Sequence, residues 1–200
     1  MEGAPGHQAA ELRKADDRGS YPAWVYARGA YGRGFPTMGG FDQMIAIVGG
    51  FWDAMLGEGR RWWITANSDS HIHYTEGGID FWPGEYSKTF VHAEKTHDGI
   101  LESMRAGRMF VVTGDLITAL DVTLSDGVTS VGWGETLKTK LGSKLTLEIA
   151  VTDPEETNAA GRNPCLNRID LIMGAVTGPQ ENVDLAHNPT TGVVERVSRE

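Results

Sequence analysis

Cysteine is almost absent from this sequence, with Cys165 the only one among 200 residues. A single thiol excludes an internal disulfide and a cysteine-based zinc cage. Basic residues are outnumbered, 18 Lys and Arg against 27 Asp and Glu, so the formal net charge is −9. With no basic stripe visible in the sequence, this balance disfavours nucleic acid as a partner.

Long apolar runs are also missing. No run approaches the roughly 20 residues that a membrane-spanning helix needs, and residues 1–7 lack a signal-peptide pattern. We therefore expect a cytoplasmic protein with no membrane partner. The composition, 40% hydrophobic and 22% charged, is typical of a soluble globular chain with one large or two small domains.

Apolar periodicity in the first half is typical of an α/β protein. Residues at i, i+3, i+4 and i+7 predict one helix over 41–56, although Gly49 and Gly50 lie inside it. An apolar run over 62–66 predicts the strand that follows. Further on, the sequence predicts a short strand, a helix with Thr96 as its N-cap that ends at Gly107, and another strand. The two strands are residues 89–93 and 109–113.

After Asp115 the pattern changes to short alternating strands without helices between them. The predicted strands are residues 119–124, 129–136, 145–151, 169–173 and 192–197. This arrangement suggests a β-sandwich-like module. We therefore predict two domains, residues 1–115 and residues 116–200, and because the chain stops just after a strand we expect the second to be truncated.

The segment after the strand at 62–66 concentrates metal-binding residue types. Asp69, His71 and His73 follow within a few positions. Side chains two residues apart point the same way in an extended chain. A carboxylate oxygen and imidazole nitrogens on one side are suitable ligands for a divalent transition metal.

Three motifs in this order resemble the PHP (polymerase and histidinol phosphatase) family of metal-dependent phosphoesterases, in particular its carbamate hydrolase-like branch with an additional β-domain. The motifs are Asn67-Ser68-Asp69-Ser70-His71, Asp80-Phe81-Trp82-Pro83-Gly84-Glu85-Tyr86, and Arg105-Ala106-Gly107-Arg108 leading to Thr113-Gly114-Asp115-Leu116-Ile117. The resemblance implies a distorted seven-stranded α/β barrel with two or three metal ions, Zn, Mn or Fe, at the strand ends.

The same resemblance assigns ligands. The late Asp-x-His motif of the family matches Asp69 and His71, and its isolated upstream histidine matches His7 beside Pro5 and Gly6. The early His-x-His motif has no counterpart in this chain. We therefore expect the C-terminal part of the barrel, residues 1–115, followed by the β-rich module.

A competing alignment takes Asp69, His71 and His73 as the early Asp-x-His-x-His motif. The rest of the barrel would then lie downstream, where the sequence offers only His92, His97 and His187. Both alignments select Asp69 and His71 as ligands.

Four further residues have a functional and a structural interpretation. His73 is either a catalytic or ligand-supporting group or a loop residue, and Glu85 either binds substrate or anchors the loop. Arg61 either clamps a phosphate or is a solvated residue at a helix end. Asp115 after Gly114 is read first as a turn residue.

These observations predict a metal-dependent hydrolase, most simply a phosphoesterase of small-molecule esters, in which a metal-activated water attacks. A carbamate or amide hydrolase on the same site is one alternative. A non-catalytic binding module with a remnant metal site is another. Because the ligand set is incomplete, we expect the isolated chain to be weakly active or inactive, and its open barrel edges to favour self-association.

Overall fold

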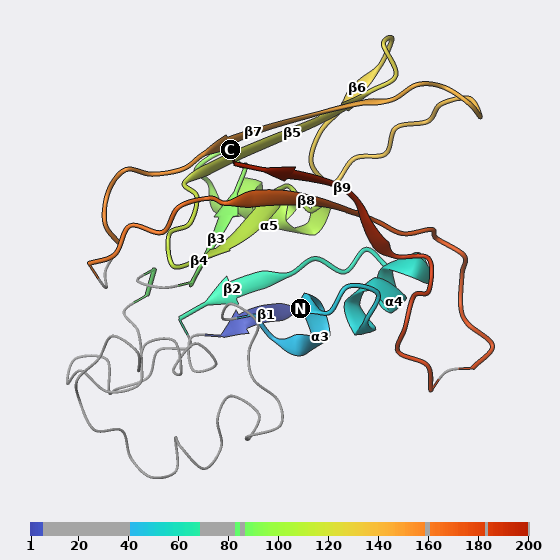
Figure 1. The fold of residues 1–200 in the computed structure, drawn as a ribbon, viewed down its shortest axis with the longest axis horizontal. Coiled ribbons are helices and arrows are strands. Elements are labelled where there is room, and N and C mark those ends of the chain that lie inside the picture. Colours follow the sequence, from blue (N-terminus) through green and yellow to red (C-terminus); the bar gives the residue numbers. More distant parts are fainter. Residues whose placement is uncertain (6–40, 69–82, 85–86, 159–160, 183, 200) are drawn as a thin grey trace.

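Small sheets, rather than one large sheet, carry the fold (Figure 1). The computed structural model describes residues 1–5, 41–68, 83–84, 87–158, 161–182 and 184–199. Within them lie β1 (Glu2–Pro5), α3 (Gln43–Ala46), α4 (Phe51–Gly57), β2 (Thr65–Asn67), β3 (Ser87–Val91), α5 (His97–Ala106), β4 (Met109–Thr113), β5 (Ala119–Ser125), β6 (Ser130–Val131), β7 (Thr146–Thr152), β8 (Arg168–Met173) and β9 (Gly192–Ser198).

β1 and β2 form a parallel pair in which Glu2 lies opposite Thr65 and Pro5 lies opposite Asn67. The chain's amino group donates to the carbonyl of Trp63 at 2.7 Å, and the Thr65 N–H donates to the carbonyl of Met1 at 2.8 Å. These contacts join the two strands where they begin, and the pairing continues to Pro5 and Asn67 with a register irregularity between Glu2 and Ala4. Both strands therefore end at the same edge.

The predicted helix over 41–56 is wrong, because the chain forms two short helices, α3 and α4, separated by a turn at 47–50. Gly49 has φ +79°, in the left-handed region that glycine adopts without strain. Its N–H donates to Oδ2 of Asp53 at 2.6 Å. The glycines thus end the helical run, and Ile47 and Val48 are left 48% and 42% exposed.

Predictions for α5 and β4 are confirmed. The Thr96 hydroxyl accepts the N–H of Gly99 at 3.0 Å, and Gly107 ends the helix with φ +78°. The strand Met109–Thr113 has the predicted bounds. Cap, helix and stop signals here are local, so the sequence contains all of them.

Thr96→Ala is expected to lower the free energy of unfolding by about 1 kcal/mol, because loss of the Thr96 hydroxyl leaves the Gly99 N–H without its acceptor. Urea unfolding followed by circular dichroism measures this. Thr96→Ser, which keeps the hydroxyl, is the control and should cost much less.

The α/β-barrel prediction is wrong. β3 and β4 flank α5 but pair antiparallel, with Ser87 opposite Thr113 and Val91 opposite Met109. An α/β barrel needs parallel strands joined through crossover helices. Within the described residues only β1 and β2 pair in parallel, and the remaining sheets are antiparallel. The helix α5 therefore connects neighbouring antiparallel strands and is not a barrel crossover.

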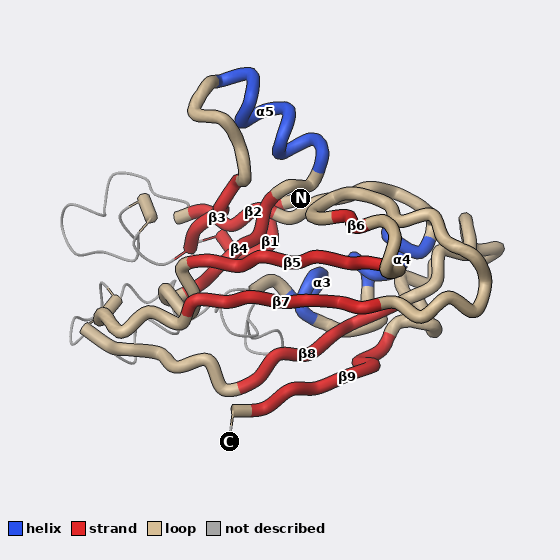
Figure 2. The backbone as a smooth tube through the Cα atoms, turned by 90° about the horizontal axis from the view of Figure 1, so that it is seen from above, coloured by secondary structure: helices blue, strands red, loops and turns tan. Residues whose placement is uncertain are grey.

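In the second half, strands form near the predicted positions. β5 pairs with β7 over seven residues, from Ala119 opposite Thr152 to Ser125 opposite Thr146. β6 is shorter than predicted, two residues, and β8 pairs with β9 as a separate sheet. Figure 2 shows β5, β7, β8 and β9 following one another in that order. The fold-class prediction of a barrel part followed by a sandwich is thus replaced by several small sheets, while the boundary at 115 stays a prediction.

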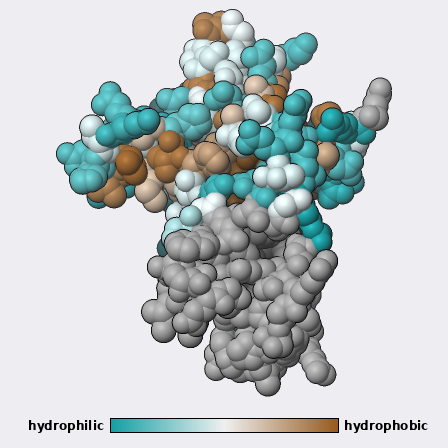
Figure 3. Space-filling view, turned by 90° about the vertical axis from the view of Figure 1, so that its left-hand side faces the viewer, coloured by the Kyte–Doolittle hydropathy of each residue, from teal (hydrophilic) through white to brown (hydrophobic). Residues whose placement is uncertain are grey.

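The apolar core of the described residues is small. Ala54, Ala66 and Val112 are at most 4% exposed, whereas Val176 is 71% and Val197 61% exposed. Figure 3 shows apolar areas among hydrophilic ones on one face of the molecule. Exposed apolar areas are typical of contact surfaces, so self-association stays a prediction.

An aromatic stack joins the two halves of the chain. Phe90 of β3 and Phe110 of β4 stack with ring centroids 4.8 Å apart, and Trp133, beyond β6, stacks on Phe110 at 5.6 Å. The ring of His92 lies 5.5 Å from that of Trp133. Across the described part of the chain, no helix is long and apolar enough to cross a membrane.

Candidate functional site

Most of the predicted site residues lie outside the described residues. These are His7, Asp69, His71, His73 and Glu85. The structure does describe the strand ends that precede them, and Arg61, Lys88 and Asp115. The candidate site is therefore built from the edge at which β1 and β2 end.

At this edge Pro5 and Asn67 are the last paired residues of the two parallel strands. In the sequence, His7 follows Pro5 by two positions, and Asp69 follows Asn67 by two positions. The amide of Asn67 donates to the Glu2 carboxylate, which ties the strands together near the edge.

Side chains of β3 hold the other side of β2. The Thr89 hydroxyl donates to the carbonyl of Ala66 at 3.0 Å and accepts its N–H at 2.9 Å. Ser87 is 3% exposed, and its hydroxyl donates to the carbonyl of Asn67. These two hydroxyls take the place of a third strand's backbone, so the end of β2 is positioned by hydrogen bonds on both sides.

A cavity of about 450 Å³ lies beside this edge. Its wall combines the end of β2, the start of β3, the Pro83–Gly84 turn and Met104 of α5. Asn67, Ser68 and Lys88 bring polar groups to it. A cavity of this size with a few polar groups is within the range of small-molecule sites.

Lys88 is the residue that sequence reasoning missed. Its ammonium forms an ion pair with Asp115, and the two side chains are 31% and 23% exposed. Asp115 has φ +57° and lies in a turn after Gly114, which confirms its interpretation as a turn residue. A lone lysine in a short strand gave no signal, because its partner is 27 residues away.

Arg61 is described but does not line this cavity. Arg61 precedes β2, whereas the candidate edge lies beyond the last residue of β2. The Nη2 of Arg61 donates to the Thr136 hydroxyl at 3.3 Å. Its neighbour Arg60 forms an ion pair with Glu58 at 2.7 Å. In the described structure Arg61 therefore contacts the second half of the chain.

No group of three or more His, Cys, Asp or Glu that could hold a metal exists among the residues that the structure describes. Two of the described carboxylates have a lowered pKa. Hydrogen bonds from the backbone N–H groups of Thr129 and Val128 lower the pKa of Asp126, and the Arg196 guanidinium lowers that of Asp170. Both belong to the β-rich half and stabilise a hairpin turn and a strand pair.

Comparison of this chain with protein-family models, with curated proteins and with solved structures finds no match. The resemblance to the PHP family therefore remains a hypothesis that depends on the motifs themselves.

Proposed function

We propose that this chain is part of a metal-dependent hydrolase whose metal site forms at the edge where β1 and β2 end, with Asp69, His71 and His7 as ligands. The parallel pairing of β1 with β2 carries this proposal, because it brings Pro5 opposite Asn67. His7 and Asp69 are 62 positions apart in the sequence, yet each follows one of these paired residues by two positions.

Chain geometry limits how far these residues can lie from the edge. Two residues span at most about 7 Å when fully extended. Paired strands are about 5 Å apart. A shared metal ion is therefore compatible with the described backbone, and this does not require a closed barrel.

The donor set suits a divalent transition metal. One carboxylate and two imidazoles match the oxygen and nitrogen ligands that Zn²⁺, Mn²⁺ and Fe²⁺ accept. When bound, such an ion supplies Lewis acidity, which makes water a nucleophile near neutral pH and stabilises negative charge on the substrate. His73 is a candidate for a supporting or proton-transfer role, and Glu85 for substrate contact.

Lys88 favours an anionic substrate. Lys88 lines the cavity beside the edge, and its ammonium forms an ion pair with Asp115. A lysine is a common phosphate-binding residue. A phosphoester of a small molecule is therefore the first substrate class to test, and a carbamate or amide the alternative. We retain a cytoplasmic location as part of this proposal.

Elemental analysis after dialysis against Zn²⁺ or Mn²⁺ tests the proposal. We expect close to one ion per chain or more, retained through gel filtration. A chain that binds neither ion would contradict the metal site and favour the alternative, a non-catalytic binding module. If metal is bound, hydrolysis of a generic phosphodiester with multiple turnovers would contradict the expectation that the isolated chain is weakly active.

A further inference from the structure

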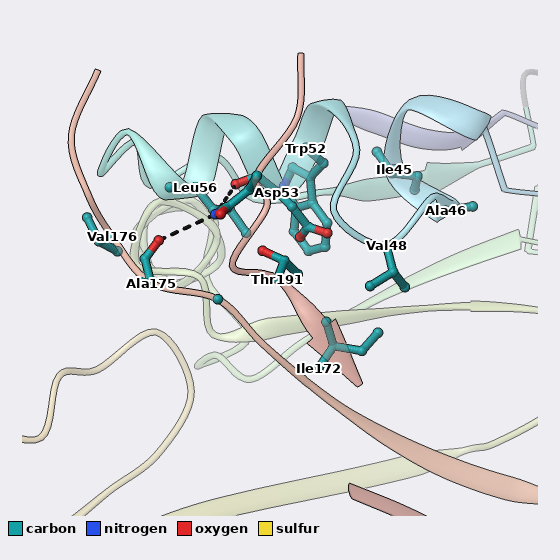
Figure 4. Close-up of a pocket in the computed structure, with 13 residues that line it drawn as sticks. Ile45, Ala46, Val48, Trp52, Asp53, Leu56, Ile172, Ala175, Val176 and Thr191 are labelled. Carbon is teal, nitrogen blue, oxygen red and sulfur yellow. Dashed lines mark hydrogen bonds between the residues drawn. The ribbon is translucent and has the colours of Figure 1, made fainter. Parts of the chain in front are cut away.

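A second cavity, of about 370 Å³, lies between the two short helices and the segment that joins β8 to β9 (Figure 4). Its walls are mostly apolar and include Ile45, Val48, Trp52, Leu56, Ile172 and Val176. Val48, Ile172 and Val176 are 42%, 44% and 71% exposed, so the cavity is open to solvent and accessible to a ligand. The cavity is separate from the candidate metal edge, because α4 lies before the beginning of β2 and the metal edge lies at the other end of β2.

Asn188 fixes the walls of this cavity. It is 4% exposed, and its N–H donates to the carbonyl of Gly49 at 2.8 Å. Its amide nitrogen donates to the carbonyls of Asp53 at 3.2 Å and Ala175 at 3.4 Å, as drawn in Figure 4. Its amide oxygen accepts from Thr190. The helix and the β8–β9 segment are thus held together, so the cavity is formed before any ligand binds.

The segment also hydrogen-bonds the end of the helix. The N–H groups of Thr177 and Gly178 donate to the carbonyl of Gly57 at 2.9 and 3.1 Å. Gly57 has no room for a side chain, because a Cβ there would lie 2.5 Å from the Asn188 amide nitrogen. The helix and the β8–β9 segment are therefore in close contact at Gly57, and the open space lies beside this contact, in the cavity.

Two polar groups interrupt the apolar lining. Asp53 lies on α4, and Thr191 lies on the facing segment. The carboxylate of Asp53 accepts the Gly49 N–H at 2.6 Å, but no described Lys, Arg or His forms an ion pair with it. A carboxylate beside apolar walls is best stabilised by a positive charge.

We propose that this cavity binds a small organic cation, a primary ammonium that carries a short apolar group. The ammonium would donate to Asp53 and to the Thr191 hydroxyl, and the apolar group would contact Trp52 and Leu56. Net charge −9 adds a general attraction for cations. This binding site is additional to the proposed hydrolase and does not depend on it.

Titration with n-butylammonium, followed by NMR of the backbone amides, tests the proposal. We expect saturable shifts at Gly49, Ala175 and Asn188. 1-Butanol, with the same apolar group and no charge, should bind at least about tenfold more weakly, because a charged hydrogen bond is lost. No saturable shift with n-butylammonium, or equal binding of both probes, would overturn the proposal.

Asp53→Asn is the decisive variant. Its amide oxygen can still accept the Gly49 N–H and its volume is unchanged, so the cavity is kept while the charge is lost. We expect n-butylammonium to bind about tenfold or more weakly to it. Asp121→Asn, which changes the net charge equally at an exposed position on β5, is the matched control and should bind as the unaltered chain does.

Thr191→Val serves as a second variant that leaves the helix unchanged. It removes the hydroxyl at nearly constant volume and should weaken n-butylammonium binding less than Asp53→Asn does. Equal weakening by Asp53→Asn and Asp121→Asn would show a general charge effect and overturn the site.

Discussion

The Asp69→Ala/His71→Ala double variant is expected to lose the Zn²⁺ or Mn²⁺ that the unaltered chain retains, with affinity at least about 100-fold weaker. Structural and catalytic zinc sites need three or more protein ligands, and loss of even a supporting group lowers metal affinity 10–100-fold. Removing two of three proposed ligands should therefore leave His7 alone, which cannot hold the ion. Elemental analysis of both proteins after identical dialysis measures the difference.

His97→Ala/Asp98→Ala is the matched control. It removes the same two residue types from the exposed first turn of α5. The control should retain the metal in full. Equal metal content in the unaltered chain and the Asp69→Ala/His71→Ala variant would contradict the proposed site. Metal loss in the control as well would favour the competing alignment, in which downstream histidines supply ligands.

Gly134→Ala is expected to lower the free energy of unfolding by about 2–5 kcal/mol. Gly134 has φ +69°, where an L-residue is strained. A Cβ there would overlap the carbonyl oxygen of Ala106 and lie 2.8 Å from its carbonyl carbon. Ala106 ends α5, so the added methyl would push the helix away from the loop that carries Trp133. Thermal or urea unfolding measures the loss.

Gly142→Ala separates the two causes of this loss. Gly142 has φ +83°, but a Cβ there meets nothing within 4 Å. The control therefore carries only the backbone strain, about 1–2 kcal/mol. Equal destabilisation by both variants would show that the contact between Gly134 and the end of α5 contributes nothing to stability.

Local signals explain which elements could be predicted from the sequence. The Thr96 cap, the Gly107 stop and the strand at Met109–Thr113 are confirmed because each is encoded by adjacent residues. Alternation over 145–151 likewise predicted β7, since a period of two needs no distant partner. Helical periodicity failed at 41–56, where the turn at Gly49 outweighed a continuous apolar stripe.

Pairing direction could not be predicted in this way. The alternation of strand and helix from 87 to 113 fits a parallel crossover and an antiparallel pair equally well. The structure has the antiparallel pair, closed by the His92 N–H donating to the carbonyl of Arg108 at 2.9 Å. Both strands also contact β2, and no local sequence pattern contains these contacts.

The sequence by itself determined the residue types from which the metal site is proposed, since chemistry and spacing point to Asp69 and His71, while the resemblance to the PHP family adds His7. It also determined the positions of most strands in the second half, because alternation is local. Only the tertiary structure brought Pro5 opposite Asn67, paired Lys88 with Asp115, and placed Asp53 in the wall of a mostly apolar cavity. Each of these depends on contacts between residues far apart in the chain, and their free energy arises only when the sheets and helices pack together.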